Sequence, residues 1–411
     1  EMCIRDRHSF FKLPFYPLLP DDPNLSLQRG RIHEFFKYTK PHRKLLEQIE
    51  LVIIDEISMV RADIIDAIDR ILRVYSHNLR EPFGGKQLLL VGDVFQLEPV
   101  VKNDEREILN RFYPTPYFFS ARVFGQIDLV SIELQKVYRQ TDPVFVSVLD
   151  HIRTNTAGAA DLQLLNTRYG SQIEESEADM YITLATRRDT VDSINEKKLA
   201  ELPGEPITFE GVIEGDFPES SLPTSQELVL KPGAQIIFSK NDFDRRWVNG
   251  TIGVIAGIDE EEETIYVITD DGKECDVKLE SWRNIRYHYN EKTKEIEEEV
   301  LGSFTQYPIR LAWAITVHKS QGLTFSRVVI DFTGGVFAGG QAYVALSRCT
   351  SLDGIQLKKP VNRADVFVRP EIVNFAGRFN NRQAIDKALK QAQADVQYLS
   401  LIHISEPTRL R

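Results

Sequence analysis

The stretch Leu51-Val-Ile-Ile-Asp-Glu-Ile-Ser-Met-Val60 decides the fold class of this chain. Its first four residues are apolar without alternation, and they run directly into two adjacent carboxylates, Asp55 and Glu56. An unbroken apolar run of this length predicts a strand that is buried on both faces of a parallel sheet. The two acids then lie at the strand's carboxyl end, where open α/β sheets hold their ligands. A site for magnesium and an attacking water in phosphoryl transfer is one interpretation, and a solvated acidic turn is the other.

The next segments repeat this order of strand, polar strand end and helix. Apolar residues at helical spacing predict a helix that ends at Tyr75, with Asp63 as its amino-terminal cap. Leu88–Val91 predicts a second buried strand, which ends in the polar sequence Gly92-Asp93-Val-Phe-Gln96-Leu-Glu-Pro99. Strands that alternate with helices in this way indicate an α/β fold with right-handed crossovers.

Further α/β segments follow on both sides of a central region. Val130–Gln140 is strand-like and ends in Tyr138-Arg139-Gln140, and Tyr181–Thr186 predicts a strand that opens a second α/β unit. After the central region, Val328–Asp331 predicts another buried strand, and Tyr343–Arg348 predicts a short helical segment that ends in an arginine. The chain therefore has two α/β units rather than one.

The central region has a different pattern. Proline and glycine become more frequent after residue 203, and short alternating strands replace helices. These strands are predicted at Thr251–Ile258, Thr264–Thr269 and Glu274–Leu279, and Asp271-Gly272 is a strong hairpin signal. The pattern predicts a small β-barrel-like insertion over residues 205–305.

Composition limits the function classes. The chain has 411 residues and a formal net charge of −11, which argues against non-specific coating of nucleic acid by the whole surface but permits a local basic channel. The three cysteines, Cys3, Cys275 and Cys349, lie too far apart for a metal motif or a disulfide framework, so a reducing cytoplasm is expected. No run of 18 apolar residues is present, so no membrane partner is expected.

Six short motifs, in order along the chain, resemble those of superfamily-one DNA helicases of the RecD/Pif type. The resemblance covers roughly residues 8–385. One motif alone is weak, because two acids after an apolar run are common, but six in order are specific. The matching residues are His8-Ser9-Phe10-Phe11, Asp55-Glu56, Gly92-Asp93 with Gln96, Tyr138-Arg139-Gln140, Thr316 with His318-Lys319 and Gln321-Gly322, and Tyr343–Arg348.

The resemblance implies an α/β fold of two RecA-like P-loop NTPase domains with parallel sheets, and a small SH3-like β-barrel inserted in the second domain. We expect the first domain at residues 8–165, the second at 166–204 and 306–358, the insertion at 205–305 and a carboxyl-terminal extension at 359–399. The end segments 1–7 and 400–411 do not continue the patterns beside them. They resemble translated sequencing-adapter read-through and are expected to be non-native, with ragged natural termini as the alternative.

For the nucleotide, the resemblance implies ATP and Mg²⁺ bound between the two RecA-like domains. Asp55 would hold the metal ion, Glu56 would orient the attacking water, and Gln96 would sense the γ-phosphate. Arg139 and Arg348 would act as arginine fingers from the second domain, because a guanidinium stays charged and presents a planar fork. The remaining residues expected at the nucleotide are Asp93, Gln321 and Gly322.

For the nucleic acid, the resemblance implies single-stranded DNA and duplex junctions as partners, with movement from 5′ to 3′ and a monomer as the default. Hydroxyl, imidazole and ammonium groups can grip phosphates without reading sequence. Phe10 and Phe11 can be core residues or a stacking platform for bases, and one of the two is expected in the core. The residues expected along the strand are His8, Ser9, Phe10, Phe11, Thr316, His318 and Lys319.

The main departure from the family is the absence of a Walker A loop, Gly-x-x-x-x-Gly-Lys-[Ser/Thr]. Gly84-Gly85-Lys86 is followed by Gln87 and comes after the acid pair, so it is no substitute. Without that loop no backbone cradle or lysine holds the β- and γ-phosphates. We therefore expect this polypeptide to bind ATP weakly and not to unwind DNA. An RNA helicase of the same superfamily and a non-catalytic nucleic-acid-binding module are the alternatives.

Overall fold

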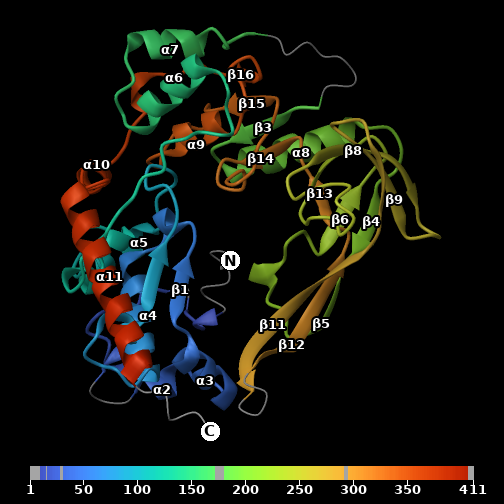
Figure 1. Ribbon diagram of the computed structural model, residues 1–411. Helices are drawn as coiled ribbons and strands as arrows, with labels where there is room; N and C mark the ends of the chain where they lie inside the picture. Colours follow the sequence, from blue (N-terminus) through green and yellow to red (C-terminus); the bar gives the residue numbers. More distant parts are fainter. Residues whose placement is uncertain (1–9, 15, 28–30, 172–179, 291–294, 406–411) are drawn as a thin grey trace.

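The computed structural model describes residues 10–14, 16–27, 31–171, 180–290 and 295–405 (Figure 1). Three buried clusters of apolar side chains organise these residues, and we call them the first core, the second core and the insertion core. Figure 1 shows the first core below the second, with the β-rich insertion beside both. Within the described helices, none has the length and apolarity that crossing a membrane requires.

The first core is built on a two-stranded parallel sheet of β1 (Leu51–Ile54) and β2 (Gln87–Leu90). Helix α4 (Ala62–Tyr75) packs against one face of this sheet, where Val52 and Ile54 are buried. The same core includes α2 (Ile32–Phe35), α3 (Lys40–Gln48) and α5 (Asn103–Leu109) at its margins. The strands and the long helix lie where the apolar pattern predicts them.

Asp63 is not the cap of α4, so this detail of the prediction is wrong. The helix begins at Ala62, and the N-cap residue is Arg61, two residues before the predicted cap. The Asp63 side chain is buried, accepts a hydrogen bond from the Leu18 backbone N–H at 2.9 Å, and pairs with Arg61 at 2.8 Å. Asp63 therefore ties the amino-terminal segment to α4 instead of terminating the helix.

The other face of the β1–β2 sheet is largely exposed, which contradicts the prediction of burial on both faces. Leu51 and Ile53 of β1 are 44% and 38% exposed, and Leu89 of β2 and Val91, which directly follows β2, are 47% and 44% exposed. These four side chains share one face because residues that alternate along paired strands point the same way. We call them the open face. Continuous apolar strands are normally covered on both sides, so the open face is unusual.

The segment at 130–140 is not a strand, so that prediction is wrong as well. It runs as an extended link between the first and second cores, outside any sheet of the described chain. Its apolar side chains are strongly exposed, with Ile132 at 66%, Leu134 at 90% and Tyr138 at 79%. The alternating apolar pattern is present, but no neighbouring strand in the described residues pairs with it.

The second core surrounds a four-stranded parallel sheet in the order β14, β3, β15, β16. The two central strands are buried at every position. This confirms the strand predicted at Tyr181–Thr186 and the buried strand predicted at Val328–Asp331. The strands are β14 (Ala314–Thr316), β3 (Ile182–Ala185), β15 (Val328–Asp331) and β16 (Ile355–Leu357). The helices around them are α6 (Pro143–Arg153), α7 (Ala159–Asn166), α8 (Arg188–Glu201) and α9 (Gln341–Ser347).

Helices α6 and α7 belong by packing to the second core. Phe145 and Leu149 of α6 and Leu165 of α7 are buried in the same cluster as the strand residues Leu184 and Ile330. The expected boundary at residue 165 had assigned both helices to the first domain. The boundary between the two cores lies instead in the link at 130–140, because the apolar side chains of this link are exposed.

The insertion contains a five-stranded antiparallel sheet in the order β10, β9, β8, β7, β13, around the insertion core. Its strands are β7 (Gln235–Phe238), β8 (Ile252–Asp259), β9 (Thr264–Thr269), β10 (Glu274–Val277) and β13 (Ile309–Leu311). The three predicted strands and the Asp271-Gly272 turn are confirmed, with Gly272 at a φ of +79°. Strand β13 extends this sheet past the expected boundary at residue 305.

A long two-stranded arm leaves the insertion and approaches the first core. It consists of β11 (Glu280–Asn290) and β12 (Glu295–Gln306), with β5 (Val212–Gly215) paired to β12 at its base. A further pair, β4 (Ile207–Glu210) and β6 (Glu227–Leu230), lies beside it. The backbone of β11 lies close to that of α3, as Figure 1 shows. The insertion thus contacts both cores.

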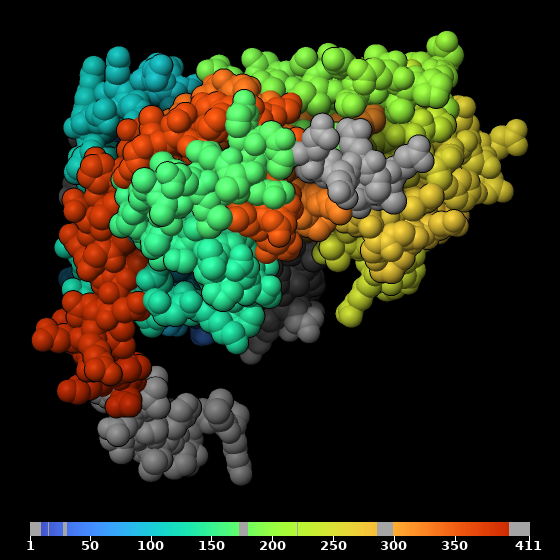
Figure 2. All heavy atoms as spheres, turned by 90° about the horizontal axis from the view of Figure 1, so that it is seen from above, coloured from blue at the N-terminus to red at the C-terminus, as the bar shows by residue number. Residues whose placement is uncertain are grey.

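The carboxyl-terminal segment returns to the first core through α10 (Pro370–Ala376) and α11 (Arg382–Ser405). Ile372 is buried in the first core, and the ring of Phe375 stacks on Phe119 at 4.4 Å between centroids. Figure 2 shows this segment and the insertion at opposite sides of the molecule. Two stretches of chain therefore cross between the cores.

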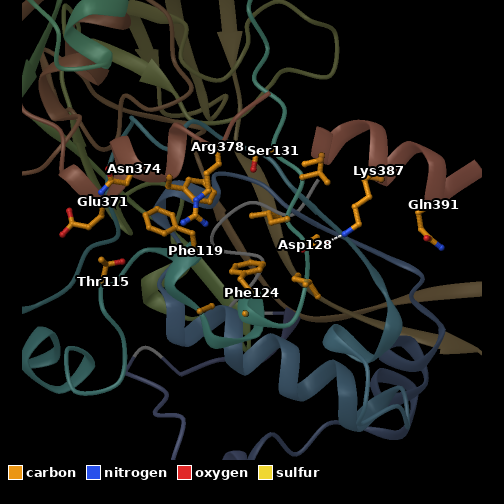
Figure 3. Close-up of a pocket in the computed structure, with 18 residues that line it drawn as sticks. Thr115, Phe119, Phe124, Asp128, Ser131, Glu371, Asn374, Arg378, Lys387 and Gln391 are labelled. Atoms are coloured by element: carbon orange, nitrogen blue, oxygen red, sulfur yellow. Dashed lines mark hydrogen bonds and ion pairs between the residues drawn. The ribbon is translucent and has the colours of Figure 1, made fainter. Parts of the chain in front are cut away.

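A cavity of about 930 Å³ lies where this segment covers the first core (Figure 3). Aromatic rings, including Phe119, Phe124 and Phe375, form part of its wall. The Lys387 ammonium on α11 pairs with the Asp128 carboxylate at 2.8 Å, and both side chains are exposed. Of the residues expected at the nucleotide or the nucleic acid, those that the structure describes do not line this cavity.

Candidate functional site between the two cores

The turn that follows β1 holds the two acids in an unusual backbone conformation. Glu56 has a φ of +49° and a ψ of +49°, a left-handed conformation that non-glycine residues rarely adopt. The Asp55 carboxylate accepts a hydrogen bond from the Glu56 backbone N–H at 2.8 Å, and the Ile57 N–H donates to the Val91 carbonyl at 3.0 Å. Strain of this kind persists where the surroundings hold it, and it is frequent at functional sites.

Gly92 lets the end of β2 lie against this acidic turn. Its φ is +150°, and a Cβ at this position would lie 2.9 Å from the Ile57 backbone nitrogen. Any side chain would therefore push the two strand ends apart. The polar residues after β1 and β2 meet at one edge, because the carboxyl ends of parallel strands lie together.

Gln321 joins this edge of the first core to the second core. It follows β14, and its side-chain amide donates to the Glu56 carboxylate at 3.2 Å and to the Gln96 amide oxygen at 3.3 Å. Gln96 in turn donates to the Asp93 carboxylate at 3.5 Å. Residues far apart in sequence thus form one polar network between the two cores. Gly322, next to Gln321, is exposed with a φ of +79°.

Arg348 lies at the end of α9 and is 1% exposed. Its guanidinium donates to the carbonyls of Val344 and Leu323 at 3.0 and 3.4 Å and to the Ser347 hydroxyl at 3.0 Å. Burial, together with the nearby Arg139 cation, lowers the pKa of Arg348 to about 10, while Glu56 acts in the opposite direction. Arg348 therefore stays charged at neutral pH and lies within electrostatic reach of Glu56.

Arg139 is held beside Arg348 by the second core. Its guanidinium donates to the Thr324 hydroxyl at 2.9 Å and to the Ser347 carbonyl at 3.3 Å, and burial lowers its pKa. Gln140, which is buried, donates to the carbonyls of Ser347 and Cys349. In the described part of the chain neither Arg139 nor Arg348 pairs with a carboxylate. Neither charge is therefore neutralised by a carboxylate, but the Arg348 guanidinium is buried and already donates to protein acceptors, so a ligand reaches it only if these groups rearrange.

The residues expected along the nucleic acid fall into two groups. Thr316 ends β14, His318 and Lys319 follow it just before Gln321, and the Lys319 N–H donates to the Thr316 hydroxyl at 3.2 Å. Burial lowers the pKa of His318, so its imidazole is neutral at pH 7. His8 and Ser9 lie outside the described residues.

Phe10 and Phe11 have different environments. Phe11 is 0% exposed and belongs to the first core, so a base cannot stack on it, and its expected role in binding nucleic acid is wrong. Phe10 is partly buried and meets Phe11 edge-on at 4.9 Å. The expectation that one of this pair is a core residue is correct for Phe11.

Relatives of this chain are found among helicases. The sequence model described as PIF1-like helicase matches residues 5–155. The ATP-dependent DNA helicase Pif1 of Campylobacter jejuni is 34% identical over 364 residues, which cover 85% of this chain and 77% of that protein. The chain belongs to the Pif1-like helicase family. The human ATP-dependent DNA helicase PIF1 is 35% identical over 311 residues, and the match covers 74% of this chain but only 45% of the human protein.

Solved structures of Pif1 helicases have the same fold. Bacteroides sp Pif1 in complex with ADP-AlF4 is 39% identical with a TM-score of 0.79, and the match covers 90% of this chain and 82% of that one. Bacteroides Pif1 bound to ssDNA is 38% identical over the same shares of the two chains, with a TM-score of 0.65. These similarities show a mixed α/β fold with parallel sheets, as expected for two RecA-like domains.

Sequence reasoning missed Arg153, the last residue of α6. Its guanidinium pairs with the Asp93 carboxylate at 3.2 Å and with Glu133 at 2.9 Å, and it lies 4.6 Å from the ring centre of Phe95. Burial opposes its charge, but these carboxylates raise the pKa of Arg153 overall. Asp93 therefore faces an arginine of the second core. No spacing rule in the sequence links residues 93 and 153, so the pair could be found only from the fold.

Lys86 does not replace the lysine of a phosphate-binding loop. Its ammonium donates to the backbone carbonyls of Glu47 and Ile49 at 3.0 and 2.5 Å, and burial lowers its pKa. Lys86 also precedes β2, whereas Asp55 and Glu56 follow β1, so the lysine and the acids lie at opposite ends of the sheet.

The donor set suits a metal ion that is shared with a phosphate. The described residues contain no group of three or more His, Cys, Asp or Glu side chains that could hold a metal on their own. Mg²⁺ commonly binds through one or two carboxylates together with substrate phosphates and waters. Asp55 and Glu56, two adjacent carboxylates that follow β1, fit that arrangement.

Proposed function

We propose that this chain is the larger part of an ATP-dependent DNA helicase motor that hydrolyses ATP between its two cores and moves along single-stranded DNA. The observation that carries this proposal is the Gln321 bridge to Glu56 and Gln96. It brings the acids of the first core to the side of the second core where Arg139 and Arg348 lie. A nucleotide bound at this contact would touch groups from both cores, so its hydrolysis would change how the cores meet.

The residues divide the chemistry of phosphoryl transfer between them. Asp55 would hold Mg²⁺, which supplies charge neutralisation at the β- and γ-phosphates when bound. Glu56 would orient the attacking water, and Gln96 would respond to the γ-phosphate. Arg139 and Arg348 would stabilise the charge that develops in the transition state, an effect worth about 10³–10⁵ in rate for one arginine.

The relatives support the choice of ligands. The Campylobacter jejuni and human relatives are named ATP-dependent DNA helicases. The Bacteroides relative has been solved with ADP-AlF4 and with ssDNA. We extend ATP and single-stranded DNA to this chain on that basis, with duplex junctions as the place where unwinding occurs. Movement from 5′ to 3′ follows from the RecD/Pif-type resemblance.

The packing of the cores supports revised domain limits. We assign residues 10–130, together with 368–379, to the first RecA-like domain, because they share the first core. Residues 143–204 and 312–366 form the second domain, and residues 205–311 form the inserted, SH3-like domain. We keep a monomer as the default. Cys275 and Cys349 are free thiols, which fits the reducing cytoplasm expected from the sequence.

We propose that the natural protein has a further strand–loop–helix unit that carries a Walker A loop, with its strand beside β2 and its helix over the open face. Two exposed apolar surfaces support it. The open face lies on the β1–β2 sheet, and the link nearby exposes Ile132 and Leu134. The strand of such a unit would pair with the free edge of β2, and the helix that follows the loop would cover the apolar side chains of the open face. Without the loop, the present chain binds ATP weakly and does not unwind DNA.

The proposed function is tested with the chain extended by its natural upstream coding sequence. The extended protein should unwind a duplex that carries a 5′ single-stranded tail and leave one with a 3′ tail intact, and Glu56→Gln should abolish unwinding. Preference for the 3′ tail would overturn the assigned polarity.

Nucleic-acid competition separates the remaining possibilities. A labelled DNA oligonucleotide bound to the extended protein should be displaced by DNA more readily than by RNA of the same sequence. Stronger displacement by RNA would make the protein an RNA helicase. If no Gly-Lys-[Ser/Thr] loop is encoded upstream and the chain binds DNA without hydrolysing ATP, it is a binding module instead.

A further inference from the structure

The loop that carries Gln96 is fixed by an arginine at each end. We call residues 93–98, which follow β2, the Gln96 loop. Its first residue, Asp93, pairs with Arg153, and its last residue, Glu98, pairs with Arg369. Arg153 belongs to the second core, and Arg369 lies where the carboxyl-terminal segment returns to the first core. Neither arginine is among the residues assigned to ATP or to DNA above.

Arg153 holds the first end of this loop through several contacts. Its guanidinium donates to both carboxylate oxygens of Asp93 at 3.2 and 3.3 Å. It also lies 4.6 Å from the ring centre of Phe95 and pairs with Glu133 of the link at 2.9 Å. Asp93 in turn accepts a hydrogen bond from the Phe95 backbone N–H at 3.1 Å. The end of α6 is thereby fixed to both side chains at the start of the Gln96 loop.

Glu98 joins three segments at the other end of the loop. Its carboxylate accepts hydrogen bonds from the Tyr117 hydroxyl at 2.6 Å and the Gly339 backbone N–H at 3.4 Å, and it pairs with Arg369 at 3.5 Å. Tyr117 belongs to the first core, and Gly339 lies in the loop of the second core that precedes α9. Glu98 therefore ties this end of the Gln96 loop to both cores at once.

The backbone of the Gln96 loop also lies against the start of α9. Gly340 precedes this helix with a φ of +75°, and a Cβ at this position would collide with the carbonyl oxygens of Phe95 and Gln96. Nearly all side chains of α9 are buried, so the helix is held as a unit, and Arg348 follows its last residue. The position of Gln96 relative to Arg348 therefore depends on how the loop is seated against α9.

Burial of the two acids makes these ion pairs effective. Exposed ion pairs contribute little, because water screens the charges and the long side chains lose freedom. The Asp93 and Glu98 side chains are only 19% and 11% exposed. Removing the arginine from such a pair leaves a poorly solvated carboxylate behind, so the loop would have to move to bring it to water. The two ion pairs thus restrict where Gln96 can lie.

We propose that Arg153 and Arg369 are positioning residues for ATP hydrolysis, which hold the Gln96 loop so that Gln96 reaches the γ-phosphate. This role rests on the proposed function, since it assumes that Gln96 responds to bound ATP. Arg153 acts through Asp93, and Arg369 acts through Glu98. A guanidinium suits this task because it stays charged and binds carboxylates in a fixed fork. The rate of hydrolysis should therefore depend on the two arginines more strongly than ATP binding does.

The first test measures DNA-stimulated ATP hydrolysis by the chain extended by its natural upstream segment. Misplacing a group by about 1 Å can cost about 100-fold in rate, so Arg153→Gln should lower kcat about 10- to 100-fold. The KM for ATP should stay within about threefold, because the lost interaction is made in the transition state. Arg153→Lys should recover part of the rate, since an ammonium can still pair with Asp93.

Arg168→Gln is the matched control for Arg153→Gln. Arg168 lies beside β16, is 20% exposed as against 18% for Arg153, and also pairs with a carboxylate, that of Asp353 at 3.5 Å. Its guanidinium donates to the carbonyls of Ile355 and Asp353, which belong to the second core side of the molecule. This variant should keep the unmodified kcat. Thermal melting of each variant checks that it is folded at the assay temperature.

The second test asks whether Arg369 acts through Glu98. Glu98→Gln and Arg369→Gln should each lower kcat about 3- to 10-fold, less than Arg153→Gln does, because Arg369 is 42% exposed. The double variant should be no slower than the slower single variant, since both changes break the same contact. Losses that multiply in the double variant would overturn the role of this pair. Lys387→Gln, which breaks an exposed ion pair of the same carboxyl-terminal segment, should leave kcat unchanged.

The outcomes separate the positioning role from the proposed function. If the unmodified extended chain does not hydrolyse ATP, the proposed function fails and the positioning role fails with it. If it hydrolyses ATP but Arg153→Gln and Arg369→Gln match its kcat, only the positioning role is overturned. A rise in the KM for ATP with kcat unchanged would also overturn it, because the arginines would then act in ATP binding.

Discussion

Two strands with nearly the same sequence have different surroundings in this molecule. Val52-Ile-Ile-Asp55 ends the exposed β1 strand of the first core, and Val328-Val-Ile-Asp331 is the β15 strand of the second. Strand β15 is buried on both faces between β3 and β16. Strand β1 has one covered face and one open face, and the sheet it belongs to has only two strands among the described residues.

The terminal acids differ as well. Asp331 accepts hydrogen bonds from the Thr333 backbone and hydroxyl and pairs with Lys358 at 3.2 Å. Burial opposes its charge, but these partners lower the pKa of Asp331 overall. Asp55 lies beside Glu56, which is bridged to the second core by Gln321. The same four-residue pattern therefore ends in a structural acid in one sheet and at the candidate nucleotide site in the other.

The largest expected effect tests whether the site needs both sheets. In the chain extended by its upstream segment, Arg348→Ala should lower DNA-stimulated ATP hydrolysis about 10³- to 10⁵-fold, because a buried cation is removed from the transition state. Arg378→Ala, at the carboxyl-terminal cavity, serves as the control and should leave the rate unchanged. A steady-state phosphate-release assay measures both. An Arg348→Ala rate within tenfold of the unmodified rate would contradict the arginine-finger role.

The second prediction concerns the cost of truncating each strand. Ile330→Ala in the buried β15 should lower the free energy of unfolding by about 2–5 kcal/mol, because it removes a fully buried side chain. Ile53→Ala on the open face should cost less than about 1.5 kcal/mol, since Ile53 is already 38% exposed. Urea denaturation of the present chain gives both values.

The same pair of variants then tests the proposed Walker A unit. If its helix covers the open face, the cost of Ile53→Ala in the extended protein should rise toward that of Ile330→Ala. An unchanged cost for Ile53→Ala in the two proteins would mean that nothing packs there.

The third prediction compares the two terminal acids. Asp331→Asn should lower the free energy of unfolding by about 1–3 kcal/mol, because the charged partner of Lys358 is lost in a buried setting. Asp55→Asn should change stability by less than about 1 kcal/mol, since an amide oxygen can still accept from the Glu56 N–H. Thermal or urea unfolding distinguishes the two. A larger loss for Asp55→Asn would show that Asp55 is the structural acid.

The smallest expected effect is a pH dependence carried by one histidine in each core. Burial lowers the pKa of His318, and burial with Arg43 and His77 lowers that of His33. Each folded-state pKa is below the unfolded one, so the unfolded chain binds more protons as the solution is acidified. Stability from these groups is complete above pH 6.5, the ordinary value, and is lost as the pH falls through it.

The dependence on salt distinguishes the contributions of the two histidines to stability. His33→Gln and His318→Gln should each flatten the fall in stability between pH 7.5 and 5.5, measured by urea unfolding. Added salt should weaken the His33 contribution more, because part of it comes from neighbouring cations, which salt screens. Equal sensitivity to salt would mean that burial is the cause in both cores.

Local patterns predicted the strands and their polar ends, because both depend on neighbouring residues and on the rule that parallel strands end together. Leu51–Ile54, Val328–Asp331 and the hairpin at Asp271-Gly272 are examples. The open face was not predictable, since its exposure depends on which other elements cover the sheet. The strand predicted at 130–140 was wrong for a similar reason. A strand forms only where a neighbouring strand pairs with it, and the local sequence does not show whether one is present.

Contacts across the two cores were also beyond sequence reasoning. Arg153 and Asp93 pair over 60 positions of sequence, and nothing in their local patterns marks them. Phe10 and Phe11 are chemically identical neighbours, and only packing decides that Phe11 is in the core. The helicase motifs identified the residues at Glu56 and Gln96, but the Gln321 bridge between them is a property of the folded chain.

The most direct measurement compares ATP hydrolysis by the present chain with that by the chain extended by its natural upstream segment, each with and without single-stranded DNA. We predict no DNA-stimulated turnover by the present chain. The extended chain should turn over at about 1–10³ s⁻¹, the usual range for enzymes. DNA-stimulated hydrolysis at that rate by the present 411 residues alone, abolished by Glu56→Gln, would contradict the account, because a sheet with an open face would then suffice.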